Sequence, residues 1–358
     1  MAKIVYGLSG EGSGHSSRSR EMISHLISKG HAVKAVSYDR GYRNLKDDFD
    51  VLEIVGLRMI NKDNKIARYK TLTENLSLVP GGVESSNILK QKLFKDFQPD
   101  AVITDFEPMT AYLANYFKIP LITIDNQHRM RYMDFNYPLD MKADAILVEN
   151  LIRAMIPRPC VSLITTFYSG EVKNDRSFLV SPILRKAIIE TKTEKKEHIL
   201  VYVTQSYEGL IEELTSYKRE KFFLYGFDRE QIDGNLIFKP FSREGFLQDL
   251  STCKAVIATA GFTLMTESLY LGKPFLAFPV MGQFEQMLNG LMLNESNYGN
   301  SVKKMNRESI SAFLYDLPEF DRNLEKYERM GNTKIIAKLD ELLENDCKLL
   351  REFHKKRQ

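Results

Sequence analysis

Residues 4–18 read IVYGLSGEGSGHSSR, and this stretch decides the predicted fold. Ile4–Tyr6 is a short apolar run typical of a buried strand, and it enters a loop rich in glycine and serine. Arg18–Lys29 follows with apolar side chains at helical spacing, Gly30 ends that helix, and Ala32–Val36 is a second apolar run. A strand, a glycine loop, a helix and a strand predict a βαβ unit whose strands are parallel and buried.

The same alternation extends along the chain and divides it into two halves. Glu190–His198 is a charged stretch with nothing to bury, and we interpret it as a solvated linker at a domain boundary. We therefore expect an α/β protein with two Rossmann-like domains, over residues 1–185 and 186–335, followed by a helix over 336–358. The predicted strands beyond the first two are 101–104, 121–124, 145–148, 199–203, 221–225, 236–238, 255–258 and 274–278.

The composition excludes several classes of protein. A chain of 358 residues with 43% hydrophobic and 27% charged residues predicts two soluble domains. The net charge of +3 argues against a protein built mainly to bind nucleic acid. Cys160, Cys253 and Cys347 are too far apart for a disulfide framework or a metal-binding pair, which is typical of a reducing compartment. Because no signal peptide and no spanning apolar run are apparent, we expect a cytoplasmic protein.

The N-terminal glycine loop presents a candidate catalytic group. Gly12 and Gly14 permit tight turns and the close approach of a ligand. His15 has two interpretations, a capping or packing histidine and a general base, and its place at the carboxyl end of a strand favours the base. Arg18 lies one helical turn later, where it either meets an anionic group or is a solvated arginine.

A second strand, glycine and helix occur near residue 261. The backbone amides that open this helix, at Gly261, Phe262 and Thr263, are suited to hold a phosphate. Glu267 lies further along the helix, placed to reach a ribose hydroxyl, although taken alone it is a surface helix residue. A carboxylate and two amides follow as a hydroxyl-binding set, and taken alone the two amides are polar residues at a helix start. This set is Glu285, Gln286 and Asn289.

The order of these motifs resembles that of GT-B glycosyltransferases, most closely the group of the peptidoglycan N-acetylglucosaminyltransferase and the UDP-glucuronosyltransferases. The resemblance runs from about residue 3 to residue 300, and the loop Gly-x-Gly-x-Gly-His-x-x-Arg resembles the acceptor-side loop of that group. It implies two Rossmann-like domains facing each other across a cleft, with the C-terminal helix packing back on the first. It further implies a catalytic base at His15, acceptor-loop roles for Gly12, Gly14 and Arg18, diphosphate binding by Gly261, Phe262, Thr263 and Ser206, nucleoside binding by Glu267 and Phe241, and donor-sugar binding by Glu285, Gln286 and Asn289.

This resemblance predicts a glycosyltransferase that moves a sugar from a UDP-sugar to a hydroxyl acceptor, a lipid-linked or cell-envelope glycan. No metal is expected, because a helix N-terminus can stabilise the leaving diphosphate and Asp48-Phe49-Asp50 reads as solvated surface. Residues 127–133, with Arg153–Arg158, are interpreted as a basic and apolar surface for peripheral contact with the inner face of the plasma membrane. Scattered charge over core residues is the alternative for that stretch.

Two other functions remain open at the level of sequence. UDP-sugar hydrolases of nonulosonic-acid pathways share the Gly-x-Gly-His-x-x-Arg loop, and their histidine activates water. Residues 12–18 match that pattern, and such an enzyme needs only a small, closed acceptor side. A non-catalytic sugar-nucleotide-binding protein is the third possibility, and the presence of His15 and Glu285-Gln286 argues against it.

Overall fold

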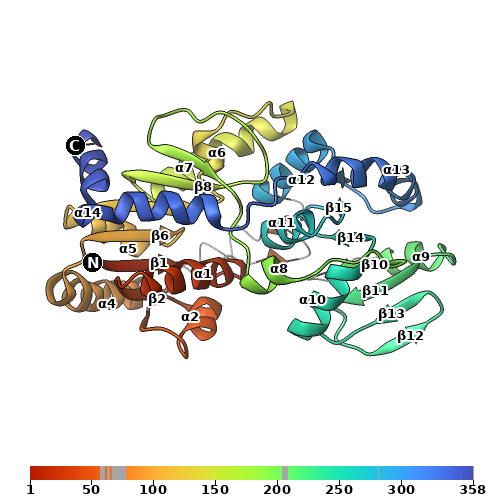
Figure 1. Ribbon diagram of the computed structural model, residues 1–358, viewed down its shortest axis with the longest axis horizontal. Coiled ribbons are helices and arrows are strands. Elements are labelled where there is room, and N and C mark those ends of the chain that lie inside the picture. Colours follow the sequence, from red (N-terminus) through yellow and green to blue (C-terminus); the bar gives the residue numbers. More distant parts are fainter. Residues whose placement is uncertain (57–60, 63–64, 67–77, 204–208, 281, 358) are drawn as a thin grey trace. The chain divides into compact units, whose positions relative to one another are not determined.

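The computed structural model describes residues 1–56, 61–62, 65–66, 78–203, 209–280 and 282–357. The chain forms two compact units (Figure 1). The first is made mainly of Met1–Lys62, Ile66–Arg185 and Met330–Gln358, and the second mainly of Lys186–Arg329. The first unit is thus built from both ends of the chain.

The first unit contains a seven-stranded sheet in which every pairing is parallel. Its strand order is β3-β2-β1-β6-β7-β8-β9. The first strand of the sequence, β1, lies inside the sheet, and later strands are added on both sides of it, as in Rossmann folds. The strands are β1 (Lys3–Leu8), β2 (Ala32–Ser37), β3 (Val51–Glu53), β6 (Ala101–Asp105), β7 (Leu121–Asp125), β8 (Val161–Thr165) and β9 (Ser177–Val180), with a separate pair β4 (Asn61–Lys62) and β5 (Lys65–Ile66).

Helices cover both faces of this sheet. On one face, α1 and α14 share a core with β1, which includes Ile23 and Leu339 (Figure 1). On the other face, α4, η1 and α5 bury their apolar side chains, among them Leu93 and Ala111. The helices are α1 (Gly14–Ser28), α2 (Asp39–Leu45), α4 (Val79–Leu89), η1 (Lys90–Phe97), α5 (Pro108–Tyr116), α6 (Arg129–Tyr132), η2 (Leu139–Met141), α7 (Lys142–Met155) and α14 (Thr333–Arg357).

The second unit has a sheet of the order β12-β13-β11-β10-β14-β15-β16, parallel except for β12. Its strands are β10 (His198–Tyr202), β11 (Lys221–Tyr225), β12 (Gln231–Asp233), β13 (Leu236–Phe238), β14 (Ala255–Ala258), β15 (Phe275–Ala277) and β16 (Gly299–Ser301). Its helices are α8 (Lys186–Glu190), α9 (Leu210–Thr215), α10 (Arg243–Thr252), α11 (Phe262–Tyr270), α12 (Phe284–Ser296) and α13 (Arg307–Glu325). The predicted α/β fold with two Rossmann-like halves is confirmed.

One local prediction is wrong. Residues 145–148 belong to α7 and not to a strand, because a short apolar run fits one face of a helix equally well. The charged stretch 190–198 is exposed at residues 192–197, as expected, but its backbone is also bonded to the second unit. The ammonium group of Lys273 donates to the carbonyl of Glu194 at 2.6 Å, and the Glu194 N–H donates to the carbonyl of Ser251 at 3.1 Å. The stretch is therefore fastened along the second unit.

The chain leaves the first unit after Arg185 and re-enters it at Met330, six residues before the predicted start of the C-terminal helix at 336. The side chain of Asn332 joins the segment that leaves the first unit to the segment that re-enters it. Its Oδ1 accepts from the N–H of Leu184 at 2.8 Å, and its Nδ2 donates to the carbonyl of Leu184 at 2.9 Å. None of the helices in the described part of the chain has the length and apolarity to cross a membrane.

Candidate active site

The glycine loop between β1 and α1 is held by close backbone packing. A Cβ atom placed on Gly10 would lie 2.1 Å from the carbonyl oxygen of Tyr38, so only glycine fits there. Gly12 has a φ of +71°, and a Cβ there would meet nothing within 4 Å. Ser13 is the residue before α1, and the helix begins at Gly14. The loop therefore presents the first turn of α1, including His15, at the carboxyl end of β1.

Gly10→Ala is expected to destabilise the first unit by roughly 3 kcal/mol, because the added methyl group overlaps backbone that cannot move freely. Gly12→Ala, in the same loop, is expected to cost only about 1 kcal/mol, the penalty of a left-handed backbone without a clash. Urea denaturation of the two variants measures both values. Equal losses would contradict the packing argument for Gly10.

His15 is paired with a buried aspartate that sequence reasoning missed. Asp105, the last residue of β6, is fully buried, and its Oδ1 lies 2.8 Å from Nδ1 of His15. Since an ionised carboxylate only accepts hydrogen bonds, Nδ1 of His15 carries the proton and donates it to Asp105. The distance of 2.8 Å between Nη2 of Arg18 and the same Nδ1 is then a contact, because a protonated Nδ1 has no lone pair to offer.

Arg18 completes this buried ion pair. Its Nε donates to Oδ2 of Asp105 at 2.7 Å and its Nη2 to Oδ1 at 2.6 Å, while the hydroxyl of Ser19 donates to Oδ2 at 3.2 Å. Burial opposes ionisation of the Asp105 carboxyl, but the Arg18 guanidinium and the His15 ring outweigh it and hold its pKa below the ordinary value. The interpretation of Arg18 as a solvated arginine is therefore wrong, and the anion that it meets is Asp105.

This arrangement prepares His15 to accept a proton. With Nδ1 protonated and fixed by Asp105, the lone pair of the imidazole is on Nε2, and the described residues make no hydrogen bond to that atom. The side chain of His15 is 13% exposed, whereas that of Asp105 is not exposed at all. A histidine oriented by a buried carboxylate is the arrangement that supports general-base catalysis on a hydroxyl group.

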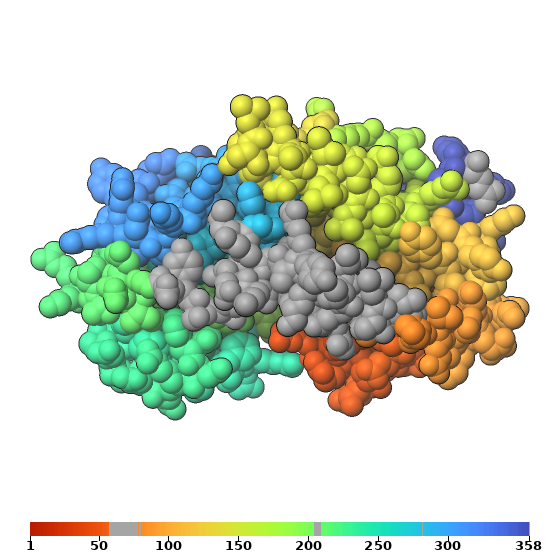
Figure 2. All heavy atoms as spheres, turned by 180° about the vertical axis from the view of Figure 1, so that it is seen from behind, coloured from red at the N-terminus to blue at the C-terminus, as the bar shows by residue number. Residues whose placement is uncertain are grey.

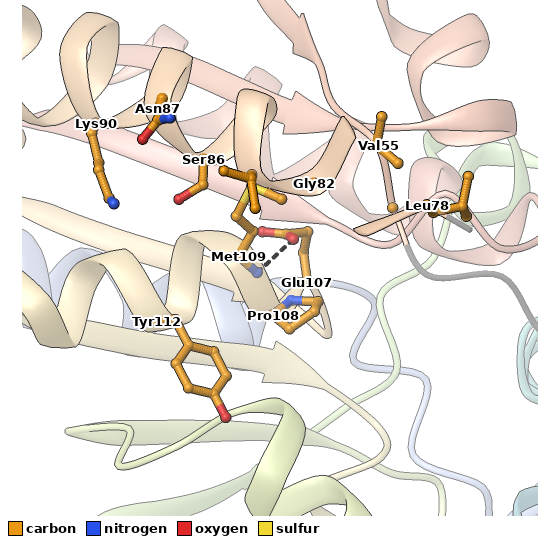
Figure 3. A pocket seen from close by; sticks show the side chains of 12 residues that line it. Val55, Leu78, Gly82, Ser86, Asn87, Lys90, Glu107, Pro108, Met109 and Tyr112 are labelled. Atoms are coloured by element: carbon orange, nitrogen blue, oxygen red, sulfur yellow. Dashed lines mark hydrogen bonds between the residues drawn. The ribbon is translucent and has the colours of Figure 1, made fainter. Parts of the chain in front are cut away.

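Glu107, Pro108 and Met109, which follow Asp105 closely in the chain, line a groove of about 490 Å³ (Figure 3). Phe106, between Asp105 and the groove, has a φ of +58°, a strained value for a side chain of its size. Glu107 then caps α5 by accepting from the N–H groups of Met109 and Thr110, both at 2.7 Å. Apolar side chains such as Val83 and Met109 line the groove together with polar ones, among them Asn87 and Lys90.

In the second unit, the glycine site lies where β14 leads into α11. Gly261 is the residue before α11, and Phe262 and Thr263 open the helix. Asn289 is fully buried, and its Nδ2 donates to the carbonyl of Ala260 at 2.7 Å, so α12 is fastened to the loop that precedes α11. Glu267 is only 3% exposed, and its interpretation as a surface helix residue is wrong.

The remaining predicted donor residues lie in the same unit. Gln286 accepts from the N–H of Val280 at 3.0 Å and donates to Oε1 of Gln283 at 2.7 Å, so its amide orders the loop before α12. Glu285 is in the first turn of α12. Phe241 is 59% exposed, with its ring centroid 5.6 Å from that of Phe246. Ser206 lies outside the described residues. Direct contacts of these residues with a donor stay predictions.

The loop of Phe241 is anchored by a group that the sequence did not indicate. The Oδ2 atom of Asp249 accepts from the hydroxyl of Tyr225 at 2.5 Å and from the ammonium group of Lys239 at 2.6 Å. Lys239 immediately follows β13 and is two residues before Phe241. The aspartate on α10 therefore positions the loop that carries the predicted nucleoside contact.

The predicted basic and apolar surface over residues 127–133 is wrong. His128 and Arg129 have no exposed area, and Gln127, Met130 and Met133 are also buried. His128 is instead bonded to Asp125, with Nδ1 2.8 Å from Oδ2. Of the residues assigned to that surface, Arg153 and Arg158 are exposed. The side chains of Asp48 and Asp50 are 53% and 61% exposed and pair with Arg20 and Lys34, as expected for solvated residues.

Comparison with solved structures places this fold among known enzymes. The glycosyltransferase of kitacinnamycin matches with a TM-score of 0.71 at 15% identity, covering 95% of this chain and 98% of that one. The calicheamicin glycosyltransferase CalG4 matches with a TM-score of 0.65 at 14% identity, covering 96% and 99%. The Streptomyces sp. SF2575 glycosyltransferase SsfS6, solved with thymidine diphosphate, matches with a TM-score of 0.58 at 15% identity, covering 99% and 100%.

The fold and the site together define a GT-B glycosyltransferase. The model of glycosyl transferase family 1 matches residues 2–318, and the chain belongs to this family. An uncharacterised glycosyltransferase of Methanosarcina mazei is 24% identical over 96% of this chain and 98% of its own length. A second, from Methanosarcina acetivorans, is 23% identical over 84% of this chain and 85% of its own. The protein is therefore a glycosyltransferase.

Proposed function

We propose that the protein transfers a sugar from a UDP-sugar to the hydroxyl group of a lipid-linked or cell-envelope glycan at the inner face of the plasma membrane. The observation that carries the catalytic part is the pair of His15 and buried Asp105, 2.8 Å apart, which leaves Nε2 of His15 as a base. A base at this place is what glycosyl transfer to a hydroxyl group requires. The membrane part rests on the resemblance of the motifs to enzymes with lipid-linked acceptors.

In the proposed reaction, Nε2 of His15 takes the proton of the acceptor hydroxyl as its oxygen attacks the anomeric carbon of the donor sugar. The bond between that carbon and the diphosphate breaks, and UDP leaves with its negative charge. The amide groups of Gly261, Phe262 and Thr263, at the N-terminus of α11, stabilise this charge. Because the helix supplies this stabilisation, the proposal includes no metal ion.

The test is an assay of UDP release from a panel of UDP-sugars, with and without candidate acceptors. The proposal predicts that release depends on a hydroxyl acceptor and that the product gains one sugar. Release at the full rate without an acceptor would instead identify a UDP-sugar hydrolase in which His15 activates water. Thermal stabilisation by UDP-sugars without release would identify a non-catalytic binding protein.

Glu267→Ala is expected to weaken UDP binding by about 10- to 100-fold, since a carboxylate that accepts from ribose hydroxyls contributes about 1.5–3 kcal/mol. Isothermal titration calorimetry with UDP measures the change. Glu308→Ala, at an exposed glutamate in the first turn of α13, is the matched control and should bind as the unchanged protein does. A folded Glu267→Ala protein with unaltered affinity would remove Glu267 from the ribose role.

A further inference from the structure

Exposed apolar side chains gather on the outer side of α5 and α7. Tyr112 and Tyr116 of α5 are 53% and 73% exposed, and Leu147 and Leu151 of α7 are 54% and 51% exposed. The hydroxyl of Tyr112 donates to the carbonyl of Ala154 at 2.6 Å, so Tyr112 adjoins the C-terminal part of α7, and Tyr116 lies one helical turn further along α5. The region around residue 150, in yellow, stands at the surface in Figure 2.

Basic side chains border this apolar area. Lys118 follows α5 directly, while Arg153 lies near the end of α7 and Arg158 just after it, and all three are exposed. The end of α14 is fastened to the same place. Nη1 of Arg357 donates to the carbonyl of Arg158, and Nδ1 of His354 lies 3.1 Å from Sγ of Cys160. This contact brings the exposed Lys355 and Lys356 of the last helical turn to the border.

The nearby acidic groups do not cancel this charge. Glu149 is 3.3 Å from Nη2 of Arg153, and Glu352 precedes the terminal basic run. We define the basic–apolar face by its four apolar and six basic side chains. They are Tyr112, Tyr116, Leu147, Leu151, Lys118, Arg153, Arg158, Lys355, Lys356 and Arg357.

We propose that the basic–apolar face binds an anionic phospholipid bilayer. Leucine and tyrosine side chains enter the boundary between head groups and acyl chains, while lysine and arginine side chains meet lipid phosphates. Nucleic acid would match the basic groups but would leave the exposed leucines without a partner. The biological role of this membrane contact rests on the function proposed above. The contact itself does not, because its residues are separate from His15 and Asp105.

The position of this face in the sheet fixes its relation to the catalytic pair. Lys118 precedes β7 and Arg158 precedes β8, so both lie at the amino ends of these strands. Asp105 is the last residue of the parallel strand β6 and lies at the carboxyl ends of the strands. At about 3.3 Å per residue, the two ends of a strand of this length are about 17 Å apart. The basic–apolar face and the catalytic pair therefore lie at opposite ends of these strands.

Flotation of the full chain with vesicles tests the proposal. Binding is expected with vesicles of phosphatidylglycerol and phosphatidylcholine, with much less binding to phosphatidylcholine alone or at high salt. Tyr116→Glu with Leu151→Glu is expected to reduce binding at least about tenfold, since both remove apolar insertion. Lys118→Glu with Lys355→Glu and Lys356→Glu should reduce it by about 100-fold, at about 1 kcal/mol for each basic group.

Ile232→Glu with Tyr315→Glu is the matched control, because these side chains are 75% and 86% exposed in the second unit. The control should bind vesicles as the unchanged protein does. Absence of binding to anionic vesicles, equal loss in the control, or preferential binding of a DNA duplex would overturn the proposal. So would a dimer in sedimentation velocity that the Tyr116 and Leu151 changes disperse. Thermal stabilisation by UDP, measured on every variant, reports separately on the proposed function.

Discussion

Asp105→Asn is expected to destabilise the protein by about 3–5 kcal/mol, the usual cost of breaking a buried ion pair from one side. The reason is that Arg18, only 7% exposed, would be left with a neutral amide in place of its carboxylate partner. The same substitution replaces the carboxylate that orients His15 with an amide, whose NH2 group can donate to Nδ1 and favour the other tautomer, so turnover should fall as well. Urea denaturation and UDP release measure the two effects on the same preparation.

The matched control is Asp48→Asn. Asp48 pairs with Arg20, which lies on α1 as Arg18 does. The side chains of this pair are exposed, at 53% for Asp48 and 37% for Arg20. A surface pair of this kind contributes about 0–1 kcal/mol. A loss in Asp105→Asn no larger than in Asp48→Asn would show that the buried pair does not support the fold.

The pH dependence of the Asp105 contribution follows from its lowered pKa. A carboxyl whose pKa is lower in the folded protein stabilises the fold above its unfolded value, about 3.9, and loses that stabilisation as the pH falls through the folded value. The stability difference between the unchanged protein and Asp105→Asn should therefore persist from pH 7 to about pH 4 and shrink below it. A difference that disappears between pH 7 and pH 5 would contradict the lowered pKa.

His15→Ala is expected to reduce turnover by about 10²–10⁴-fold while leaving UDP affinity nearly unchanged. The loss arises because the acceptor hydroxyl no longer has a base, whereas the predicted donor-binding residues, from Ser206 to Asn289, belong to the second unit. Steady-state UDP release with acceptor, together with calorimetry of UDP binding, separates the two quantities. Unchanged turnover would exclude His15 as the base.

The helix α1 offers a close control for this variant. His25 lies on the same helix, is also 13% exposed, and its Nε2 is 2.7 Å from Oδ1 of Asp340. His25→Ala should cost a comparable amount of stability, because it also breaks a histidine–aspartate pair, but it should not alter turnover. A similar loss of turnover in His25→Ala would mean that both changes act only through the stability of α1.

The sequence predicted the features that depend on neighbouring residues. The β1–α1 loop could be read locally because glycine spacing, strand propensity and helical periodicity all lie within about thirty residues. The partner of His15 could not be found in this way, since Asp105 is 90 residues away and meets His15 only through the pairing of β1 with β6. The one available signal was an acidic residue at the carboxyl end of a predicted strand.

The errors have a related physical cause. Arginine and histidine in residues 127–133 suggested a surface, because buried charges need partners and sequence spacing does not show distant ones. In α7, the apolar run over residues 145–148 was assigned to a strand because burial on a sheet was assumed. Ile146 and Leu147 are instead exposed, on a helix that buries Ala145 and Ile152.

The place of α14 in the first unit has a consequence for how the protein is made. Its Ile335, Leu339 and Leu342 fill the same core as Ile4 and Ile23, which are synthesised more than 300 residues earlier. On the ribosome, the whole of the second unit has emerged before this helix exists. The nascent first unit must therefore leave the part of this face that α14 covers exposed until α14 is synthesised, while the second unit can fold ahead of it. The unit that begins the chain is the last to be finished.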